Sequence, residues 1–177
     1  FAAPAPLRNV IKDGNRFNSV RCVMSAGAPV SDGLLSDVEY SFPNAKLFSP
    51  YGMTEMLIVT DGVRGHATAP RGVPVGHPLL GVHVSIFPLG CKSGEDISPV
   101  PVGATGEIFV SGPWLSVGYD QPWLRNRDAR IQHAGREWHR SGDIGHVNAG
   151  LFVEGLVAQV IHKSTSVLTP IPIGQTV

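Results

Sequence analysis

The residues with the clearest potential for chemistry lie in the segment 49–55, which reads SPYGMTE. Tyr51 offers an aromatic face, and Gly52 allows the backbone to approach a ligand closely. Thr54 adds a hydroxyl and Glu55 a carboxylate. This set suits a nucleotide, with the ring against the base, the hydroxyl toward a phosphate and the carboxylate toward Mg²⁺. An ordinary strand-to-loop turn, with Tyr51 in the core and Glu55 in solvent, fits equally well, so the segment alone leaves both interpretations open.

A second segment, 25–29 (SAGAP), places small residues directly after a predicted strand and contains Gly27, Ala28 and Pro29. Ligands of open α/β sheets bind at the carboxyl ends of the strands. If the two preceding strands are neighbours, this turn and segment 49–55 face one crevice. Taken by itself, however, segment 25–29 is better interpreted as an ordinary tight turn.

A third segment, 138–143 (WHRSGD), ends in Asp143. An aspartate fixed after a glycine turn can accept hydrogen bonds from both hydroxyls of a ribose. It can equally be a β-turn residue that bonds its own backbone. Segment 105–112 (TGEIFVSG), followed by Gly118 and Tyr119, is typical of a hairpin strand with turn glycines, and we interpret it as structural.

The elements that must position these segments differ between the two halves of the chain. Up to about residue 60, helix and strand patterns alternate, as in an α/β layer. We expect a short helix at 6–11, a strand at 18–24 and a strand at 46–48. Between the strands, Ser31 is a plausible helix N-cap, and a helical spacing of apolar residues follows it at Leu34, Leu35, Val38 and Phe42. We assign residues 1–72 to this α/β portion.

From residue 73 the pattern becomes one of short alternating strands separated by Gly, Pro, Asn and Asp turns. Such spacing indicates a small antiparallel barrel or sandwich, and we assign residues 73–177 to a β-rich subdomain. The runs expected to form strands are 82–87, 107–110, 138–140, 151–154 and 157–161.

Composition argues against several classes of function. The formal net charge is zero and no basic run interleaves with aromatic residues, so we expect no nucleic-acid partner. No apolar stretch of about 18 residues occurs, so we expect no transmembrane segment. The seven histidines show no metal-ligand spacing.

The two cysteines bear on the compartment. Cys22 lies in the apolar run 20–24, where we expect a buried thiol, and Cys91 follows Gly90 in a predicted loop. Two isolated cysteines make no disulfide framework, which favours a reducing, cytoplasmic location.

Taken together and in this order, the segments resemble the adenylate-forming superfamily of acyl-CoA synthetases, luciferases and peptide-synthetase adenylation domains. The resemblance spans most of the chain from about residue 20 to residue 161. Its pieces are 27–29 (GAP), 51–55 (YGMTE), 103–107 (GATGE) through Gly118-Tyr119, and 141–143 (SGD). It implies the end of an α/β layer followed by a β-rich, barrel-like subdomain, together a fragment of such an enzyme's large N-terminal domain.

The resemblance also implies a reaction. A carboxylic acid attacks the α-phosphorus of Mg-ATP to give an acyl-adenylate and pyrophosphate. A thiol acceptor such as CoA then takes the acyl group. Transfer of this kind depends on positioning and charge neutralisation more than on covalent chemistry by the protein.

By the same resemblance, Thr54 and Glu55 are the catalytic residues, Thr54 at the α-phosphate and Glu55 as the Mg²⁺ ligand. Tyr51 would stack on the adenine, and Asp143 would bind the ribose hydroxyls. The implied nucleotide-binding set is Gly27, Ala28, Pro29, Tyr51, Gly52, Met53, Thr54 and Asp143.

The chain departs from the family pattern in several places. The phosphate loop expected upstream is absent, and so is the C-terminal domain with its catalytic lysine, so we expect a fragment that is inactive without the rest of its parent enzyme. Leu156 stands where the family has an arginine, and Ala158 stands at a nearby acidic position. Ser49 replaces a more strongly polar residue.

Within the superfamily, the segment 138–143 resembles long-chain acyl enzymes, in particular the β-lactone synthetases of bacterial olefin biosynthesis. A fatty or β-hydroxy fatty acid is therefore the expected substrate. Two alternatives remain open: an amino-acid or aryl-acid adenylation domain, and a non-catalytic structural or interaction fragment.

Overall fold

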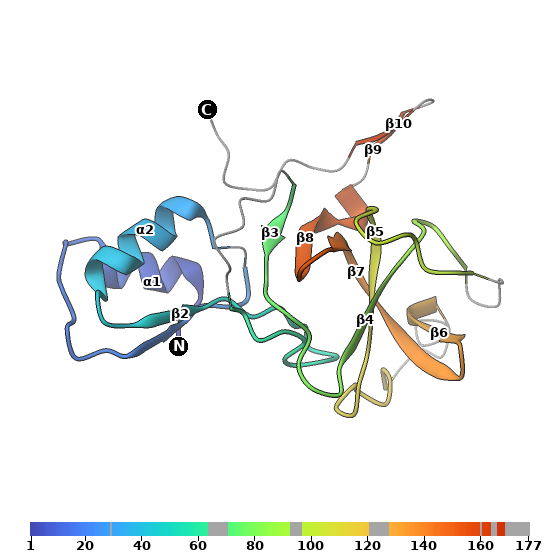
Figure 1. Cartoon of the computed structure of the whole chain (residues 1–177), viewed down its shortest axis with the longest axis horizontal. Helices are drawn as coiled ribbons and strands as arrows, with labels where there is room; N and C mark the ends of the chain where they lie inside the picture. The colour runs from blue at the N-terminus through green and yellow to red at the C-terminus, as the bar shows by residue number, and fades with distance from the viewer. Residues whose placement is uncertain are drawn as a thin grey trace.

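A computed structural model describes residues 1–28, 30–63, 71–92, 97–120, 128–159, 161–163 and 166–168. Figure 1 shows two short helices packed with a small parallel sheet at one end of the molecule, and a larger antiparallel sheet at the other end. No helix in the described part of the chain has the length and apolar character needed to cross a bilayer.

The two helices form where the sequence predicts them. α1 (Pro4–Ile11) begins with a proline in its first turn, where no amide donor is needed. α2 (Asp32–Ser41) begins after Ser31, whose hydroxyl accepts a hydrogen bond from the Leu34 amide at 3.4 Å. The helical spacing of apolar residues is confirmed, because the buried cluster of this region consists of Leu7, Ile11, Val23, Val30, Leu34, Val38 and Phe42.

Beside the helices, β1 (Cys22–Met24) and β2 (Lys46–Phe48) pair in parallel. The predicted strand at 46–48 is confirmed, whereas the strand predicted at 18–24 is limited to its last three residues. Just past the strands, the Ser25 amide donates to the Phe48 carbonyl at 2.9 Å. The chain therefore leaves both strands at the same edge, as expected for segments 25–29 and 49–55.

The expectation of a buried thiol at Cys22 is wrong, whereas Cys91 lies in a loop, as predicted. Cys22 is exposed, because Val23 is the residue of β1 that faces the helices. Cys91 is buried with Phe87, Phe109, Ile131 and Trp138 in a second apolar cluster.

The larger sheet has six strands in the order β3-β8-β7-β5-β4, with β6 also paired to β7, and every pairing is antiparallel. Its path has two ends, β3 and β4, among the described residues. The antiparallel character predicted for this half is therefore confirmed. The strands are β3 (Val73–Pro74), β4 (His83–Phe87), β5 (Gly106–Ser111), β6 (Arg130–His133), β7 (Arg136–Val147) and β8 (Leu151–Leu156).

The end of the chain differs from the expected strand at 157–161. A 3₁₀ turn, η1 (Val157–Gln159), follows β8 directly. β9 (Ile161–Lys163) then pairs with β10 (Ser166–Leu168) in a separate two-stranded ladder.

β7 is the strand around which the sheet is built. β5 lies along one of its edges, while β6 pairs with its first residues and β8 with its last residues. Along β7, the pairing with β6 ends at His139 and the pairing with β8 begins at Asp143. Some residues of β7 pair with β5 on one side and with β6 or β8 on the other, so β6 and β8 lie along the same edge of β7, opposite β5. Residues 140–142 of β7 pair with neither β6 nor β8. The main apolar core lies under this sheet and includes Met56 and Val59 from the loop after β2.

Candidate functional site

The turn after β1 presents small residues to solvent. Gly27 and Ala28 are exposed, and Gly27 adopts a φ of +89° that side-chain-bearing residues rarely take. A Cβ atom at Gly27 would meet nothing within 4 Å, so the conformation and not lack of space requires glycine there. Pro29, the third residue expected at this turn, lies outside the described residues.

The loop after β2 fixes the backbone of Tyr51 through both its donor and its acceptor. The Tyr51 carbonyl accepts from the amides of Val59 at 2.8 Å and Thr60 at 3.2 Å. Its amide donates to Thr60 Oγ1 at 2.9 Å, and that hydroxyl donates onward to the Val75 carbonyl at 2.5 Å. The position of the Tyr51 side chain is therefore set by its own loop and by Val75, which directly follows β3 of the large sheet.

The other residues of this loop lie at its tip. Gly52 and Thr54 are exposed, and Met53 is half-buried and pairs through its backbone with Met56. A Cβ atom at Gly52 would lie 3.3 Å from Ile58 Cα, so glycine lets the loop fold back on itself. The exposure of Thr54 leaves its hydroxyl available to a ligand.

Asp143 is positioned by an irregularity in the ladder between β5 and β7. The register shifts between Glu107 and Phe109, so Ile108 has no partner in this ladder. The Ser141 hydroxyl fills the gap: it donates to the Ile108 carbonyl at 2.8 Å and accepts from the Asp143 amide at 3.0 Å. Gly142, with a φ of +77°, allows the strand to turn between the two residues.

The Asp143 side chain meets Tyr51, which lies 92 residues earlier in the chain. The Tyr51 hydroxyl donates to Asp143 Oδ2 at 2.5 Å. Burial raises the pKa of Tyr51 well above its ordinary value, and the adjacent Asp143 carboxylate raises it further. Burial also raises the pKa of Asp143, which the bond from Tyr51 opposes. This contact brings two of the sequence segments into one site.

Glu55 is surrounded by a different set of residues. The Tyr119 hydroxyl donates to Glu55 Oε1 at 2.6 Å, and the Ser116 amide donates to the Glu55 carbonyl at 2.7 Å. The bond from Tyr119 is the main cause that lowers the pKa of Glu55, and the positive charge of nearby Arg130 lowers it as well, against the opposing effect of burial. Glu55 is therefore ionised at neutral pH.

His139 lies buried behind Tyr119, with the two ring centroids 6.4 Å apart. Its pKa is lowered first by burial and then by the positive charge of Arg130. A neutral imidazole at this point packs against Tyr119 without adding a second positive charge beside Arg130.

Sequence reasoning missed three residues around Glu55. Tyr119 ends the segment that we interpreted as structural, and Ser116 precedes it. Arg130 lies on β6, a strand that the alternating pattern did not indicate. In the sequence, the tyrosine three residues after Ser116 in a Gly-containing loop was only a weak indication of a functional residue. Nothing in the sequence around Arg130 indicated a functional role.

Mg²⁺ was the metal expected at Glu55. Among the described residues, no group of three or more His, Cys, Asp and Glu side chains could hold a metal ion. One ionised carboxylate nevertheless fits this cation, because Mg²⁺ is usually bound by one or two carboxylates together with substrate phosphates. Glu55 would supply the carboxylate oxygen for such a site.

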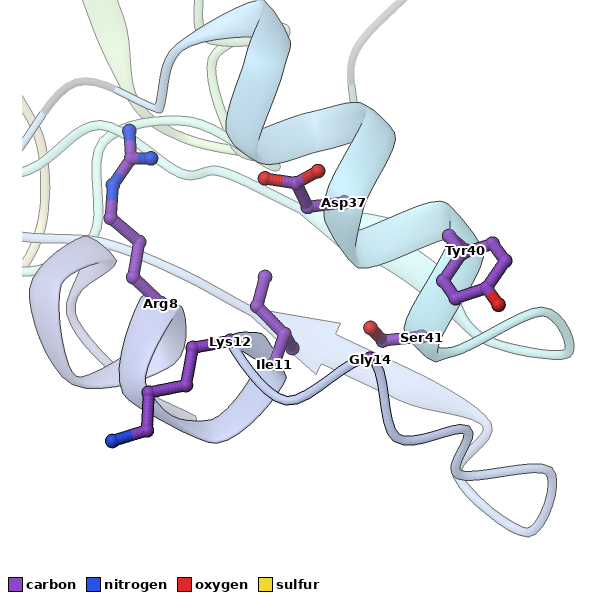
Figure 2. Close-up of a pocket in the computed structure, with 7 residues that line it drawn as sticks. All are labelled: Arg8, Ile11, Lys12, Gly14, Asp37, Tyr40 and Ser41. Atoms are coloured by element: carbon purple, nitrogen blue, oxygen red, sulfur yellow. The ribbon is translucent and has the colours of Figure 1, made fainter.

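A cavity of about 410 Å³ lies elsewhere in the fold, between α1, α2 and the loop after α1 (Figure 2). None of its lining residues belongs to the segments described above. They are Arg8, Ile11, Lys12, Gly14, Asp37, Tyr40 and Ser41.

Comparisons with known proteins agree with these segments. Residues 1–120 match the model of a family described as "AMP-binding enzyme". The chain is 31% identical over 165 residues to an olefin β-lactone synthetase of Xanthomonas campestris pv. campestris, covering 84% of this chain and 30% of that protein. It is 32% identical over 142 residues to a 4-coumarate–CoA ligase of Vanilla planifolia, covering 80% of this chain and 25% of the relative. It therefore spans less than a third of the length of these relatives.

Among solved structures, the fold resembles the O-succinylbenzoate coenzyme A synthetase of Bacillus subtilis in complex with ATP and magnesium ion. The TM-score is 0.75 at 24% identity, and the match covers 96% of this chain and 34% of that structure. The likeness extends to the fold of the described α/β and β-rich parts together.

Proposed function

The chain belongs to the AMP-binding enzyme family, and on that premise we propose that it forms part of the nucleotide site of a longer enzyme that activates a carboxylic acid. The acid attacks the α-phosphorus of ATP, an acyl-adenylate forms and pyrophosphate leaves. One observation carries the proposal: the 2.5 Å bond from Tyr51 to Asp143 joins two segments that have no reason to meet in a simple turn. Perturbed, half-buried groups of this kind gather at functional sites.

In the proposed site, the exposed turn of Gly27 and Ala28, with Pro29 after them, lies against the adenine, and the ring of Tyr51 stacks on it. Asp143 holds the ribose. Its Oδ2 already accepts from Tyr51, and the remaining acceptor positions of the carboxylate suit the two ribose hydroxyls. The Ser141 bridge and Gly142 keep this carboxylate in place before the nucleotide binds.

Thr54 and Glu55 serve the phosphates. Thr54 donates its exposed hydroxyl to the α-phosphate, and Glu55 holds Mg²⁺ through its ionised carboxylate. When bound, Mg²⁺ neutralises charge on the phosphate oxygens. Tyr119 and Ser116 keep Glu55 in a defined position throughout.

For the acid, we propose a fatty or β-hydroxy fatty acid, with a thiol such as CoA or an internal hydroxyl as the final acceptor. Identity of 31% and 30% to two proteins named olefin β-lactone synthetase supports this choice. An aryl acid is the main alternative, because ligases named for 4-coumarate match at 32% and 31%. An amino acid is a further one, since a malpinin synthetase and a plipastatin synthase subunit match at 29% and 31%.

The rest of the parent enzyme is the chain's necessary partner in this proposal, and the 177-residue chain is inactive alone. We propose that residues 1–72 carry the contacts to the adenine, the α-phosphate and Mg²⁺, and that residues 73–177 carry the ribose contact through Asp143. Met56 and Val59, which pack in the core of the large sheet, then link the two parts. A non-catalytic fragment is the remaining alternative, and it predicts no acid-dependent reaction by the full-length protein.

The test is acid-dependent exchange of labelled pyrophosphate into ATP by the full-length protein. The panel contains fatty acids, β-hydroxy fatty acids, aryl acids and amino acids of graded size. We expect exchange with long-chain acids at least tenfold faster than with the other classes, the difference that about 1.4 kcal/mol of added binding gives. Preference for an aryl or amino acid would overturn the substrate assignment, and no exchange with any acid would overturn the proposed function.

A further inference from the structure

Glu55 is held at two points by one short segment, residues 116–119. The Ser116 amide donates to the Glu55 carbonyl at 2.7 Å, and the Tyr119 hydroxyl donates to Glu55 Oε1 at 2.6 Å. The backbone contact fixes where Glu55 lies, and the side-chain contact fixes how its carboxylate is turned. A single segment therefore sets both the position and the orientation of this carboxylate.

The segment is itself anchored to the sheet by Arg130 of β6. Arg130 Nη2 donates to the Ser116 carbonyl at 2.6 Å and to Ser116 Oγ at 3.0 Å. The Arg130 side chain is only 10% exposed, and charge-assisted bonds in such a setting are strong. The support of Glu55 thus runs from β6 through Arg130 and Ser116.

Apolar burial does not account for the whole segment. Val117, in its middle, is fully exposed at 104%. Tyr119 is half-buried against the buried ring of His139, which limits the movement of the tyrosine ring. Its hydroxyl donates to the charged carboxylate of Glu55.

We propose that Tyr119 is a positioning residue for the Glu55 carboxylate: it holds one oxygen so that the other serves a divalent cation. The inference rests on the proposed role of Glu55 as the Mg²⁺ ligand. A carboxylate already held by a hydroxyl loses less conformational freedom when the cation binds. Partners of this outer kind typically contribute roughly tenfold to a hundredfold to metal affinity.

The experiment measures Mn²⁺ as a paramagnetic substitute for Mg²⁺, by electron paramagnetic resonance of the free ion. The full-length protein is saturated with a non-hydrolysable ATP analogue. Tyr119→Phe keeps the ring and removes the hydroxyl, and Tyr40→Phe is the matched control because Tyr40 is 58% exposed on α2. We expect Tyr119→Phe to weaken Mn²⁺ binding roughly tenfold to a hundredfold. Affinity for the nucleotide without metal stays unchanged, and so does every value for Tyr40→Phe.

Glu55→Gln separates this inference from the proposed function. If Glu55→Gln weakens Mn²⁺ binding and Tyr119→Phe does not, Tyr119 is not a positioning residue, while the metal role of Glu55 stands. If Glu55→Gln itself leaves Mn²⁺ affinity unchanged, the proposed metal site fails and this inference fails with it.

A second pair of variants covers the case in which Tyr119→Phe does not fold. Val117→Gly loosens segment 116–119 without removing buried surface, and Val102→Gly is its control in another loop, since Val102 is 84% exposed. A loss of Mn²⁺ affinity of about threefold or more in Val117→Gly alone supports the inference, by the loss of preorganisation. Equal affinities in the two variants overturn it.

Discussion

Asp143 and Leu156 face each other as direct partners in the antiparallel ladder between β7 and β8. Side chains of such partners lie on the same face of the sheet within reach of one another. Leu156 is 46% exposed, so its side chain reaches solvent beside the half-buried carboxylate instead of packing into the core. The position opposite the proposed ribose ligand therefore has room for a longer, polar side chain.

Leu156→Arg should improve the use of ATP by the full-length protein. An arginine at 156 can donate to the ribose or to Asp143, and each charge-assisted bond contributes about 1.5–3 kcal/mol. That corresponds to a KM for ATP roughly tenfold to a hundredfold lower, or an equal rise in kcat/KM. Leu156→Met, which adds no donor, is the control. Unchanged ATP kinetics with a lowered melting temperature would show that the arginine is buried without a partner.

Asp143→Asn should separate stability from function. Because the folded-state pKa of Asp143 is raised above its unfolded value of 3.8, ionising this group costs more in the folded protein than in the unfolded one. The cost is absent below the unfolded pKa and fully present above the folded pKa. Relative to Asp143→Asn, the wild type should therefore lose stability as the pH rises above 3.8 and through the raised folded-state pKa, by at most about 1.4 kcal/mol per pH unit.

Urea unfolding at several pH values measures this difference, and nucleotide titration at neutral pH measures the function. We expect Asp143→Asn to be at least as stable as the wild type at neutral pH and to bind ATP more weakly. A variant whose stability deficit grows with rising pH would contradict the sign of this argument.

Glu107→Gln should destabilise the sheet beneath the site. Glu107 is 3% exposed and bonds Arg140 through both carboxylate oxygens, at 3.2 and 2.6 Å. Removing one partner of a buried pair leaves the other charge uncompensated, which costs about 3–5 kcal/mol. Glu137→Gln is the matched control, because Glu137 is 49% exposed and its bond to Arg130 is long at 3.4 Å, so its loss should cost much less. Similar urea midpoints for the two variants would refute the importance of the buried pair.

The local elements of this fold were predictable, because their causes lie within a few residues of each other. Ser31 and the apolar spacing after it specify α2 without help from the rest of the chain. The short run Lys46–Phe48, with two large apolar residues, likewise specifies β2. The same holds for Gly27 in the turn after β1.

Features of a strand that depend on how it pairs with a neighbouring strand were not predictable from the sequence. β7 runs from Arg136 to Val147, but alternation fails in its middle, where the ladder to β5 is irregular and Ser141 replaces a backbone partner. The polar β6 has only one fully buried residue, Ile131, and so shows no strand pattern. The contact between Tyr51 and Asp143 joins residues 92 positions apart. Predicting it would require knowing the irregular pairing of β5 with β7, which sets the position of Asp143.

The central claim is that these segments form the nucleotide and metal site of an acid-activating enzyme. Its most direct test is acid-dependent pyrophosphate exchange by the full-length protein at limiting Mg²⁺, for the wild type, Glu55→Gln and the exposed control Glu39→Gln. The account predicts exchange by the wild type and by Glu39→Gln. It predicts a loss of about a hundredfold or more in Glu55→Gln, since charge stabilisation at the phosphates is lost while the protein stays folded. Full exchange by Glu55→Gln under limiting Mg²⁺, or no acid-dependent exchange by the wild type, would contradict it.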